Sequence, residues 1–193
     1  MLAAVPALEK VVKFLNELIP IRAQKLTAEE QATLADCHLI TAKPMLFVCN
    51  IGENDIATGG SAHSKAVFAH AEKVGAKAIL ISGKIESELV QLSEEERQVF
   101  METLGMQEAG VDRLVRAGYE LLGLATYFTA GEKEVRAWTI KKGWKAPQAA
   151  GVIHTDFEKG FIKAEIVSYA DLTHLGSVAA AREAGKYRLE GKE

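Results

Sequence analysis

The stretch MLFVCNIGE at residues 45–53 decides the fold of this chain. Its first five residues are apolar without interruption, which is typical of a strand buried on both faces of a parallel sheet. The apolar run at 78–81 repeats the pattern, and a helical pattern over 64–74 that Gly75 closes lies between the two runs. Strand, helix and strand in this order predict a βαβ unit within an α/β sheet.

Polar residues follow both predicted strands. Asn50, Ile51 and Glu53 come after the first strand, and Ser82 opens the Ser-Gly-Lys sequence after the second. Ligands of open α/β sheets bind outside the carboxyl ends of the strands. An amide that donates and accepts, beside a carboxylate that accepts, has the chemistry needed to read the edge of a nucleobase. The alternative is an ordinary strand-to-loop turn, where Asn is also common.

Helical patterns surround this unit. The apolar spacing over 8–19 predicts an amphipathic helix that Pro20 ends. Capping-box sequences open two further predicted helices, one running from Thr27 to about Cys37 and one from Ser93 to Gly105. In the second of these, the three consecutive glutamates at 94–96 are favoured by the helix dipole.

The period changes from helical to extended near 122–125. Residues 127–129 and 135–140 flank a short polar loop and predict a hairpin, and 161–169 predict a further strand. A turn-rich stretch separates the hairpin from that strand. The sequence therefore predicts a second, small α+β domain after residue 122.

Composition excludes several classes of protein. The 193 residues are 48% hydrophobic and 25% charged, with a formal net charge of −3, which argues against a disordered chain and against a strongly basic nucleic-acid-binding protein. Cys37 and Cys49 have apolar neighbours and are expected to be buried, reduced thiols. We expect neither a signal peptide nor a membrane span, and a cytoplasmic location.

Other chemistry-bearing residues have structural explanations. His63 and His70 share a helical spacing, but no further ligand joins them, so we expect no metal site. His154 and Asp156 resemble part of a catalytic triad, but neighbours in an extended loop usually point apart, and a role in the turn is expected. We expect no catalytic residue.

A basic and aromatic cluster follows the predicted hairpin. Its residues are suited to phosphate neutralisation and base stacking: Lys141, Lys142, Trp144 and Lys145. The alternative is a solvated charge cluster at the end of a hairpin.

Several of these segments together resemble the YchF family of Obg-like ATPases, P-loop proteins related to translation-factor GTPases. The residues that carry the resemblance are the Asn-x-x-Glu at 50–53, the Ser-Gly-Lys at 82–84, and the runs 126–131, 134–140 and 146–162. The resemblance implies that Asn50 and Glu53 form an altered base-reading motif that goes with a preference for ATP over GTP. It also implies that the backbone at Ile51 contacts adenine and that Ser82 opens the fifth nucleotide motif, where the family usually has Ala in place of Gly83.

The same resemblance implies an organisation of the chain. Residues 1–38 would be the end of a helical insertion, and 39–122 the second half of a P-loop nucleotide-binding domain with a mostly parallel sheet. Residues 123–193 would be a ubiquitin-like β-grasp TGS domain that lacks its last strand. The chain thus resembles the C-terminal portion of the family.

The implied function is that of a ribosome-associated, ATP-binding and ATP-hydrolysing protein. The sequence holds no Gly-x-x-x-x-Gly-Lys-[Ser/Thr] motif, so we expect this chain not to hydrolyse ATP alone, and Mg²⁺ to bind only with the N-terminal half. The expected partners are ATP and, through the TGS domain, the ribosome or rRNA. Two alternatives stay open, namely an RNA-binding or ribosome-binding module and a non-functional remnant of a split gene. An exposed half-sheet starting at Met45 would also favour self-association.

Overall fold

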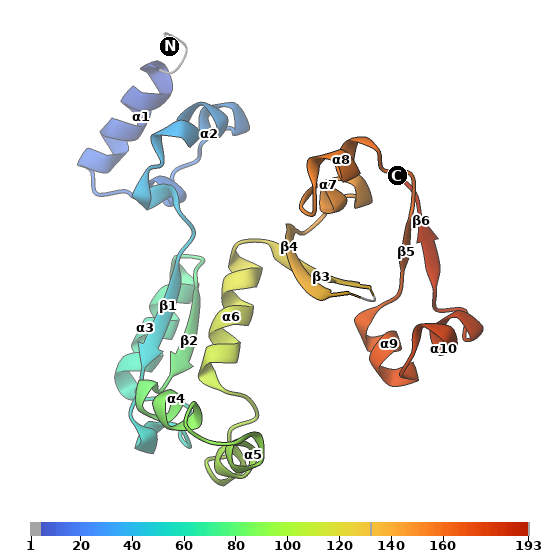
Figure 1. The fold of residues 1–193 in the computed structure, drawn as a ribbon. Coiled ribbons are helices and arrows are strands. Elements are labelled where there is room, and N and C mark those ends of the chain that lie inside the picture. Colours follow the sequence, from blue (N-terminus) through green and yellow to red (C-terminus); the bar gives the residue numbers. More distant parts are fainter. Residues whose placement is uncertain (1–4, 132, 193) are drawn as a thin grey trace. The chain divides into compact units, whose positions relative to one another are not determined.

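The computed structural model describes residues 5–131 and 133–192 of the chain, which divides into two compact units, Met1–Leu122 and Gly123–Glu193 (Figure 1). Predictions about the first four residues, about Glu132 in the hairpin loop and about Glu193 lie outside the described residues.

The first unit begins with helices and continues as an α/β unit. Its main elements are α1 (Val5–Asn16), α2 (Ala28–Leu34), β1 (Leu46–Asn50), α3 (Ala62–Lys73), β2 (Lys77–Ile81), α4 (Gly83–Leu89), α5 (Glu94–Thr103) and α6 (Gly110–Leu121), with short 3₁₀ turns between 21 and 55.

The α1–α2 region has its own small core. Ala7, Val11, Ile21 and Leu34 are buried together there. The helix α1 ends earlier than predicted, at Asn16, because Leu18 adopts a left-handed φ of 60° and the Ile19 N–H returns to the Phe14 carbonyl at 2.9 Å. This is the hydrogen-bonding pattern that commonly closes helices, here with a leucine where glycine is usual.

Both predicted capping boxes are confirmed. At α2, the Thr27 hydroxyl accepts from the Glu30 N–H while the Glu30 carboxylate accepts from the Thr27 N–H. At α5, Ser93 and Glu96 make the same reciprocal pair. These contacts satisfy N–H groups that have no partner within the helix, so they fix where each helix begins.

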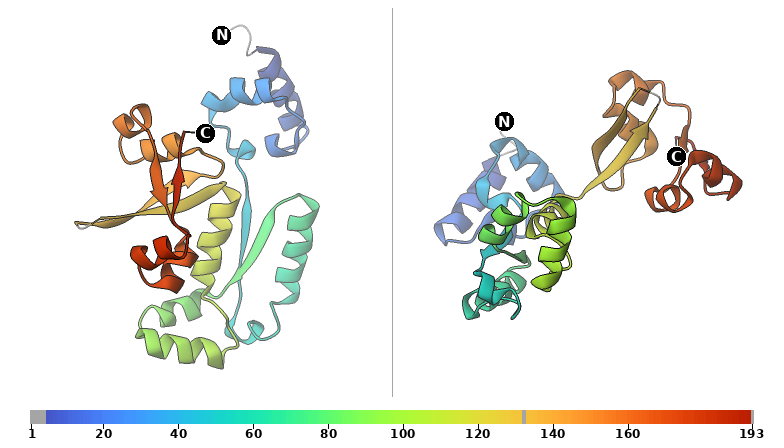
Figure 2. Two further views of the ribbon diagram at one scale, coloured as in Figure 1. Left: turned by 90° about the vertical axis from the view of Figure 1, so that its right-hand side faces the viewer. Right: turned by 60° about the horizontal axis from the view of Figure 1, so that its bottom comes forward.

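The predicted βαβ unit is confirmed. The strands β1 and β2 pair in parallel, with Asn50 opposite Ile81. The helices α3 and α6 both pack against this pair, and they lie on opposite sides of it in both figures (Figure 1; Figure 2, left). The carboxyl ends of both strands therefore lie side by side.

Burial of the first strand on both faces was wrong. Val48, in the middle of β1, remains 45% exposed, and most of the strand is only half-buried. Within the described residues β1 has one neighbouring strand, β2, so its other edge has no strand beside it. The expected burial of the cysteines was also wrong, since Cys37 lies exposed in a surface 3₁₀ turn and Cys49 is half-buried in β1.

The second unit contains two antiparallel strand pairs and four short helices among its described residues. Its elements are β3 (Leu124–Ala130), β4 (Val135–Lys141), α7 (Ala146–Gly151), α8 (Thr155–Lys159), β5 (Ala164–Ile166), α9 (Tyr169–Leu175), α10 (Val178–Glu183) and β6 (Arg188–Glu190). The pair β3–β4 is the predicted hairpin, with Tyr127 opposite Trp138, and β5 pairs with β6.

The predicted strand over 161–169 was too long. The structure keeps only Ala164–Ile166 as β5, because the Ser168 hydroxyl accepts from the Asp171 N–H at 3.0 Å and starts α9. At the other end Phe161 is buried, 8% exposed, ahead of the strand. The apolar residues predicted a longer strand, but the helix cap at Ser168 ends the extended segment and begins α9.

Candidate functional site

The carboxyl ends of β1 and β2 bring the predicted site residues together. Asn50 ends β1, and Ser82 follows β2 directly. The Ile51 N–H donates to the Ile81 carbonyl at 2.8 Å, so the pairing continues one residue beyond the strand. Asn50, Ile51, Glu53 and Ser82 therefore lie at one edge of the α/β unit.

The Asn50 side chain joins the two strand ends. Its Oδ1 accepts a hydrogen bond from the Gly83 N–H at 3.0 Å. Because this bond occupies Oδ1, the Asn50 amide NH₂ is presented as a donor group with a fixed orientation. A Cβ at Gly83 would lie 3.6 Å from Asn50 Oδ1, an ordinary contact, so an alanine would fit here as well.

Ser82 places an unpaired hydroxyl beside this bond. The residue is only 5% exposed, and its Oγ has no hydrogen-bond partner among the described residues. It precedes α4 without capping it. A buried polar atom without a partner costs free energy, so a hydrogen-bonding group brought by a ligand would be stabilised at this point.

Glu53 opens a 3₁₀ turn just beyond β1 and meets Lys84 from the first turn of α4. Lys84 Nζ donates to Glu53 Oε2 at 3.0 Å and also lies 3.9 Å from Glu88 Oε1. The hydrogen bond to Glu53, together with the negative charges of Glu53 and Glu88, raises the pKa of Lys84. This contact between side chains was not predicted, although opposite charges just beyond two neighbouring strands were a signal for it.

A cavity of about 300 Å³ runs along β1 near these residues. Its lining includes residues 47–50 of β1, Ile51 and His63, but neither Glu53 nor Ser82. The other histidine, His70, packs edge-on against Phe47, with ring centroids 5.7 Å apart. No group of three potential metal ligands occurs within 5–131 and 133–192.

A buried carboxylate behind the site was not foreseen. Glu86 in α4 is 9% exposed, and it accepts from the Gly110 N–H at 2.7 Å and the Val111 N–H at 3.2 Å, at the start of α6. These hydrogen bonds join α4, which follows Ser82, to α6, which packs against the strand pair. No sequence pattern predicts this contact, because Glu86 and Gly110 lie far apart along the chain.

The basic and aromatic cluster belongs to the second unit. Lys141 ends β4, Lys142 lies in the turn that follows, Trp144 comes just after that turn, and Lys145 precedes α7. All four side chains are exposed, Trp144 at 37%. None of the three ammonium groups forms an ion pair with another described residue.

His154 has the structural role that its sequence context indicated, although it does not point away from Asp156. Its Nδ1 accepts from the Asp156 N–H at 3.2 Å and caps α8, and the same nitrogen lies 3.5 Å from Asp156 Oδ2. A ring nitrogen that accepts a backbone hydrogen bond is committed to that contact.

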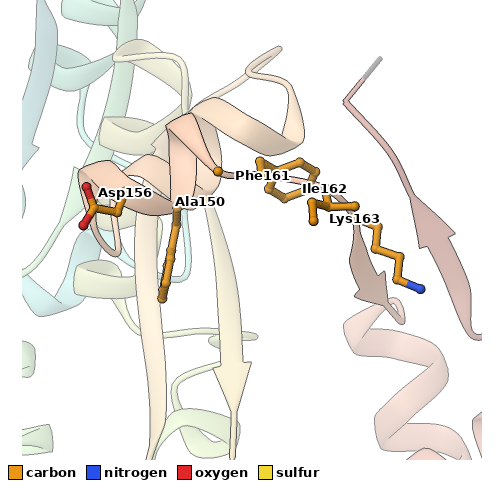
Figure 3. A pocket seen from close by; sticks show the side chains of 7 residues that line it. Ala150, Asp156, Phe161, Ile162 and Lys163 are labelled. Carbon is orange, nitrogen blue, oxygen red and sulfur yellow. The ribbon is translucent and has the colours of Figure 1, made fainter.

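A second cavity, of about 350 Å³, lies in the second unit (Figure 3). It is lined by residues of α7, of α8 and of the segment 160–163 that leads to β5. Its two charged side chains, Asp156 and Lys163, point outward at opposite ends (Figure 3). The polar groups therefore do not converge on one ligand position.

Known proteins are similar to this chain over most of its length. A family model named YchF-GTPase_C, described as a protein of unknown function (DUF933), matches residues 124–193. The ribosome-binding ATPase YchF of Bacillus subtilis is 53% identical over 175 residues, which cover 90% of this chain and 48% of that protein. The protein of the same name in Escherichia coli O157:H7 is 44% identical over 191 residues, 99% of this chain and 52% of that one.

A eukaryotic relative and a solved structure agree with these matches. Obg-like ATPase 1 of Caenorhabditis elegans is 42% identical over 188 residues, 96% of this chain and 47% of that protein. The structure of the Schizosaccharomyces pombe YchF GTPase superimposes with a TM-score of 0.82 at 38% identity, covering 97% of this chain and 50% of that one. This chain spans about half the length of the curated relatives it matches.

The first unit is thus an α/β unit with polar side chains gathered at the ends of two parallel strands. The chain corresponds to the C-terminal portion of the YchF family. No helix among the described residues is long and apolar enough to cross a membrane.

Proposed function

We propose that this chain carries the base-recognition part of an ATP-binding site in a YchF-like, ribosome-associated protein. The observation that carries the proposal is the 3.0 Å hydrogen bond from the Gly83 N–H to Asn50 Oδ1, which fixes an amide donor at the meeting point of two parallel strand ends. In this proposal, 39–122 form the second half of a P-loop domain, 1–38 the end of a helical insertion, and 123–193 a TGS domain.

Each site residue has a distinct role in adenine recognition. Asn50 offers its NH₂ to a ring nitrogen of the base, and the backbone of Ile51 contacts the base edge. The unpaired hydroxyl of Ser82 finds its partner on the bound nucleotide. Glu53 lies at the rim of the site, 46% exposed, bound to Lys84.

Hydrolysis requires groups beyond these residues. Phosphoryl transfer depends on a phosphate cradle and on Mg²⁺ that bridges the phosphates. The 193 residues contain no P-loop motif, so we propose that Mg²⁺ and the phosphates are held by an N-terminal half and that this chain alone is not catalytic. The whole assembly would be an ATPase that prefers ATP to GTP.

Calorimetric titration of the folded chain with ATP, and separately with GTP, tests this proposal. Without phosphate contacts we expect a dissociation constant on the order of 1 mM, corresponding to about −4 kcal/mol, with ATP preferred. Equal affinity for both nucleotides, or no heat with either one at tens of millimolar, would show that the strand ends do not recognise adenine.

The second unit supports a further candidate function, binding to the ribosome or to rRNA. Lys141, Lys142 and Lys145 present three exposed charges around the exposed ring of Trp144. Charges that contact phosphates and an aromatic ring that stacks on an unpaired base are the usual groups of RNA recognition. The relatives named as ribosome-binding ATPases are consistent with this role and with work in the cytoplasm.

Self-association is a third proposal for the isolated chain. The edge of β1 away from β2 has no strand beside it in the described residues, and Val48 is 45% exposed there. Open strand edges with apolar residues pair readily with other chains. Light scattering after gel filtration, with Val48→Lys as the variant, should show a shift toward the monomer if this edge mediates association.

A further inference from the structure

The Lys84–Glu53 ion pair lies just beyond the two strand ends that form the proposed base site. Glu53 comes from the turn after β1, and Lys84 from the first turn of α4 after β2, so the pair bridges the same two strand ends as Asn50 and Gly83. The Nζ–Oε2 distance is 3.0 Å, which is a hydrogen-bonded contact and not only a nearby charge.

We propose that Lys84 positions the Glu53 carboxylate away from the base edge and thereby makes the site reject guanine. This inference rests on the proposed function, since it concerns the selectivity of that same site. Lys84 is a positioning residue here, because its effect on the base passes through Glu53.

The chemistry of the two bases explains the effect. Guanine presents two neighbouring N–H donors, on N1 and N2, and a free carboxylate accepts both at once. Adenine presents one donor, N6, beside one acceptor, N1, and gains no such paired contact. A carboxylate held by an ammonium group has one oxygen occupied and its charge compensated. It therefore adds little to the binding of guanine, while the binding of adenine is almost unchanged.

The surroundings of the pair support a role in selectivity and not in folding. The side chain of Lys84 is 69% exposed and that of Glu53 is 46% exposed, and exposed ion pairs contribute little to stability. The 3.0 Å hydrogen bond makes the Glu53 carboxylate the main partner of the ammonium group, and it is the largest cause of the raised pKa of Lys84. Glu88 is a second, more distant partner, at 3.9 Å.

The test measures ATP and GTP affinity in parallel for four forms of the 193-residue chain: unchanged, Lys84→Met, Glu53→Gln and the double variant. Lys84→Met frees the carboxylate, so we expect the affinity for GTP relative to ATP to rise about fivefold, the order of the net contribution of one ordinary hydrogen bond. In the Glu53→Gln background the same lysine change should leave the ratio unchanged, because the carboxylate is gone.

Lys77→Met is the matched control. Lys77 is another exposed lysine of the same unit, at the opposite end of β2, and it pairs with Glu120. The Lys77→Met variant should keep the ratio of GTP affinity to ATP affinity at the value of the unchanged chain.

The outcomes separate this inference from the proposed function. If the unchanged chain prefers ATP but Lys84→Met leaves the ratio within twofold, the role of Lys84 is refuted and the base site stands. The role of Lys84 is also refuted if Lys84→Met changes the ratio of GTP affinity to ATP affinity equally in the unchanged chain and in the Glu53→Gln background. Lys84 would then act on the base directly and not through Glu53. If the unchanged chain binds neither nucleotide, the proposed function falls, and this inference falls with it.

Discussion

The Glu86 carboxylate and the Gly110 N–H form a 2.7 Å hydrogen bond that joins α4 to the first turn of α6. There is no room for a side chain at this contact: a Cβ on Gly110 would lie 2.6 Å from Glu86 Oε1 and 2.9 Å from Ile81 Cγ1. The glycine is required here by close approach, since its φ is not in the left-handed region.

Replacing Glu86 should destabilise the first unit. Glu86→Ala leaves two N–H groups at the start of α6 without an acceptor, at a cost of about 2–3 kcal/mol in the free energy of unfolding. Glu86→Gln keeps one acceptor oxygen and should cost less than half of that. Urea denaturation of both variants measures the difference, and Glu88→Ala, on the same helix but exposed, is the control; equal losses for residues 86 and 88 would contradict the role of the buried carboxylate.

Asn50 should have separable effects on stability and on nucleotide binding. Asn50→Ala removes the acceptor for the Gly83 N–H, so we expect a loss of about 1 kcal/mol and a clearly weaker affinity for ATP. Asn50→Asp keeps an acceptor for that N–H but lacks the NH₂ donor, so stability should recover while ATP affinity stays low. Asn54 is an exposed neighbour, and Asn54→Ala should change neither the stability measured by thermal unfolding nor the ATP affinity measured by calorimetry.

The strand ends were predictable from sequence because two independent patterns meet there. The uninterrupted apolar runs placed β1 and β2, and parallel pairing then requires that Asn50 and Ser82 lie at one edge. The capping boxes at Thr27 and Ser93 were equally readable, since they are local. The long-range contacts of Glu86 and Lys84 were not predictable, because each depends on how α4 packs, and α4 itself was not predicted.

The short helices of the second unit were also missed. The helices α7 to α10 are five to seven residues long, too short to show an apolar period, and three of them begin at polar caps: His154, Ser168 and Ser177. Ser168 in particular ended the predicted strand, since its cap overrides the extended preference of the residues around it.

The basic turn of the second unit should control RNA binding. Changing Lys141, Lys142 and Lys145 together to Glu should weaken binding to ribosomes at least tenfold and flatten the dependence of affinity on salt, because fewer counterions are released. Co-sedimentation across a salt series measures both. The matched control changes Lys133, Lys159 and Lys163, three other exposed lysines of the same unit, to Glu; if both triple variants bind equally, the turn is not the RNA-binding surface.

The α1–α2 region should lose stability in acid. Lys10 donates to both oxygens of Glu30, and these bonds, together with the one from the Thr27 N–H, lower the pKa of Glu30 below its usual 4.5. A lowered pKa in the folded state means that the stabilisation is complete above the unfolded value of about 4.5 and is lost as the pH falls through the folded value. Thermal unfolding followed from pH 7 to pH 3 should therefore be less pH-dependent in Glu30→Gln than in Glu29→Gln, which changes the same charge on the same helix.

The base-recognition site is tested most directly by backbone NMR shifts of the folded chain during titration with ATP. The predicted result is a cluster of saturating shifts at Asn50, Ile51, Ser82 and Gly83, with an apparent dissociation constant on the order of 1 mM. Shifts confined to 141–145, or none at these four residues with ATP at tens of millimolar, would contradict adenine recognition at the strand ends.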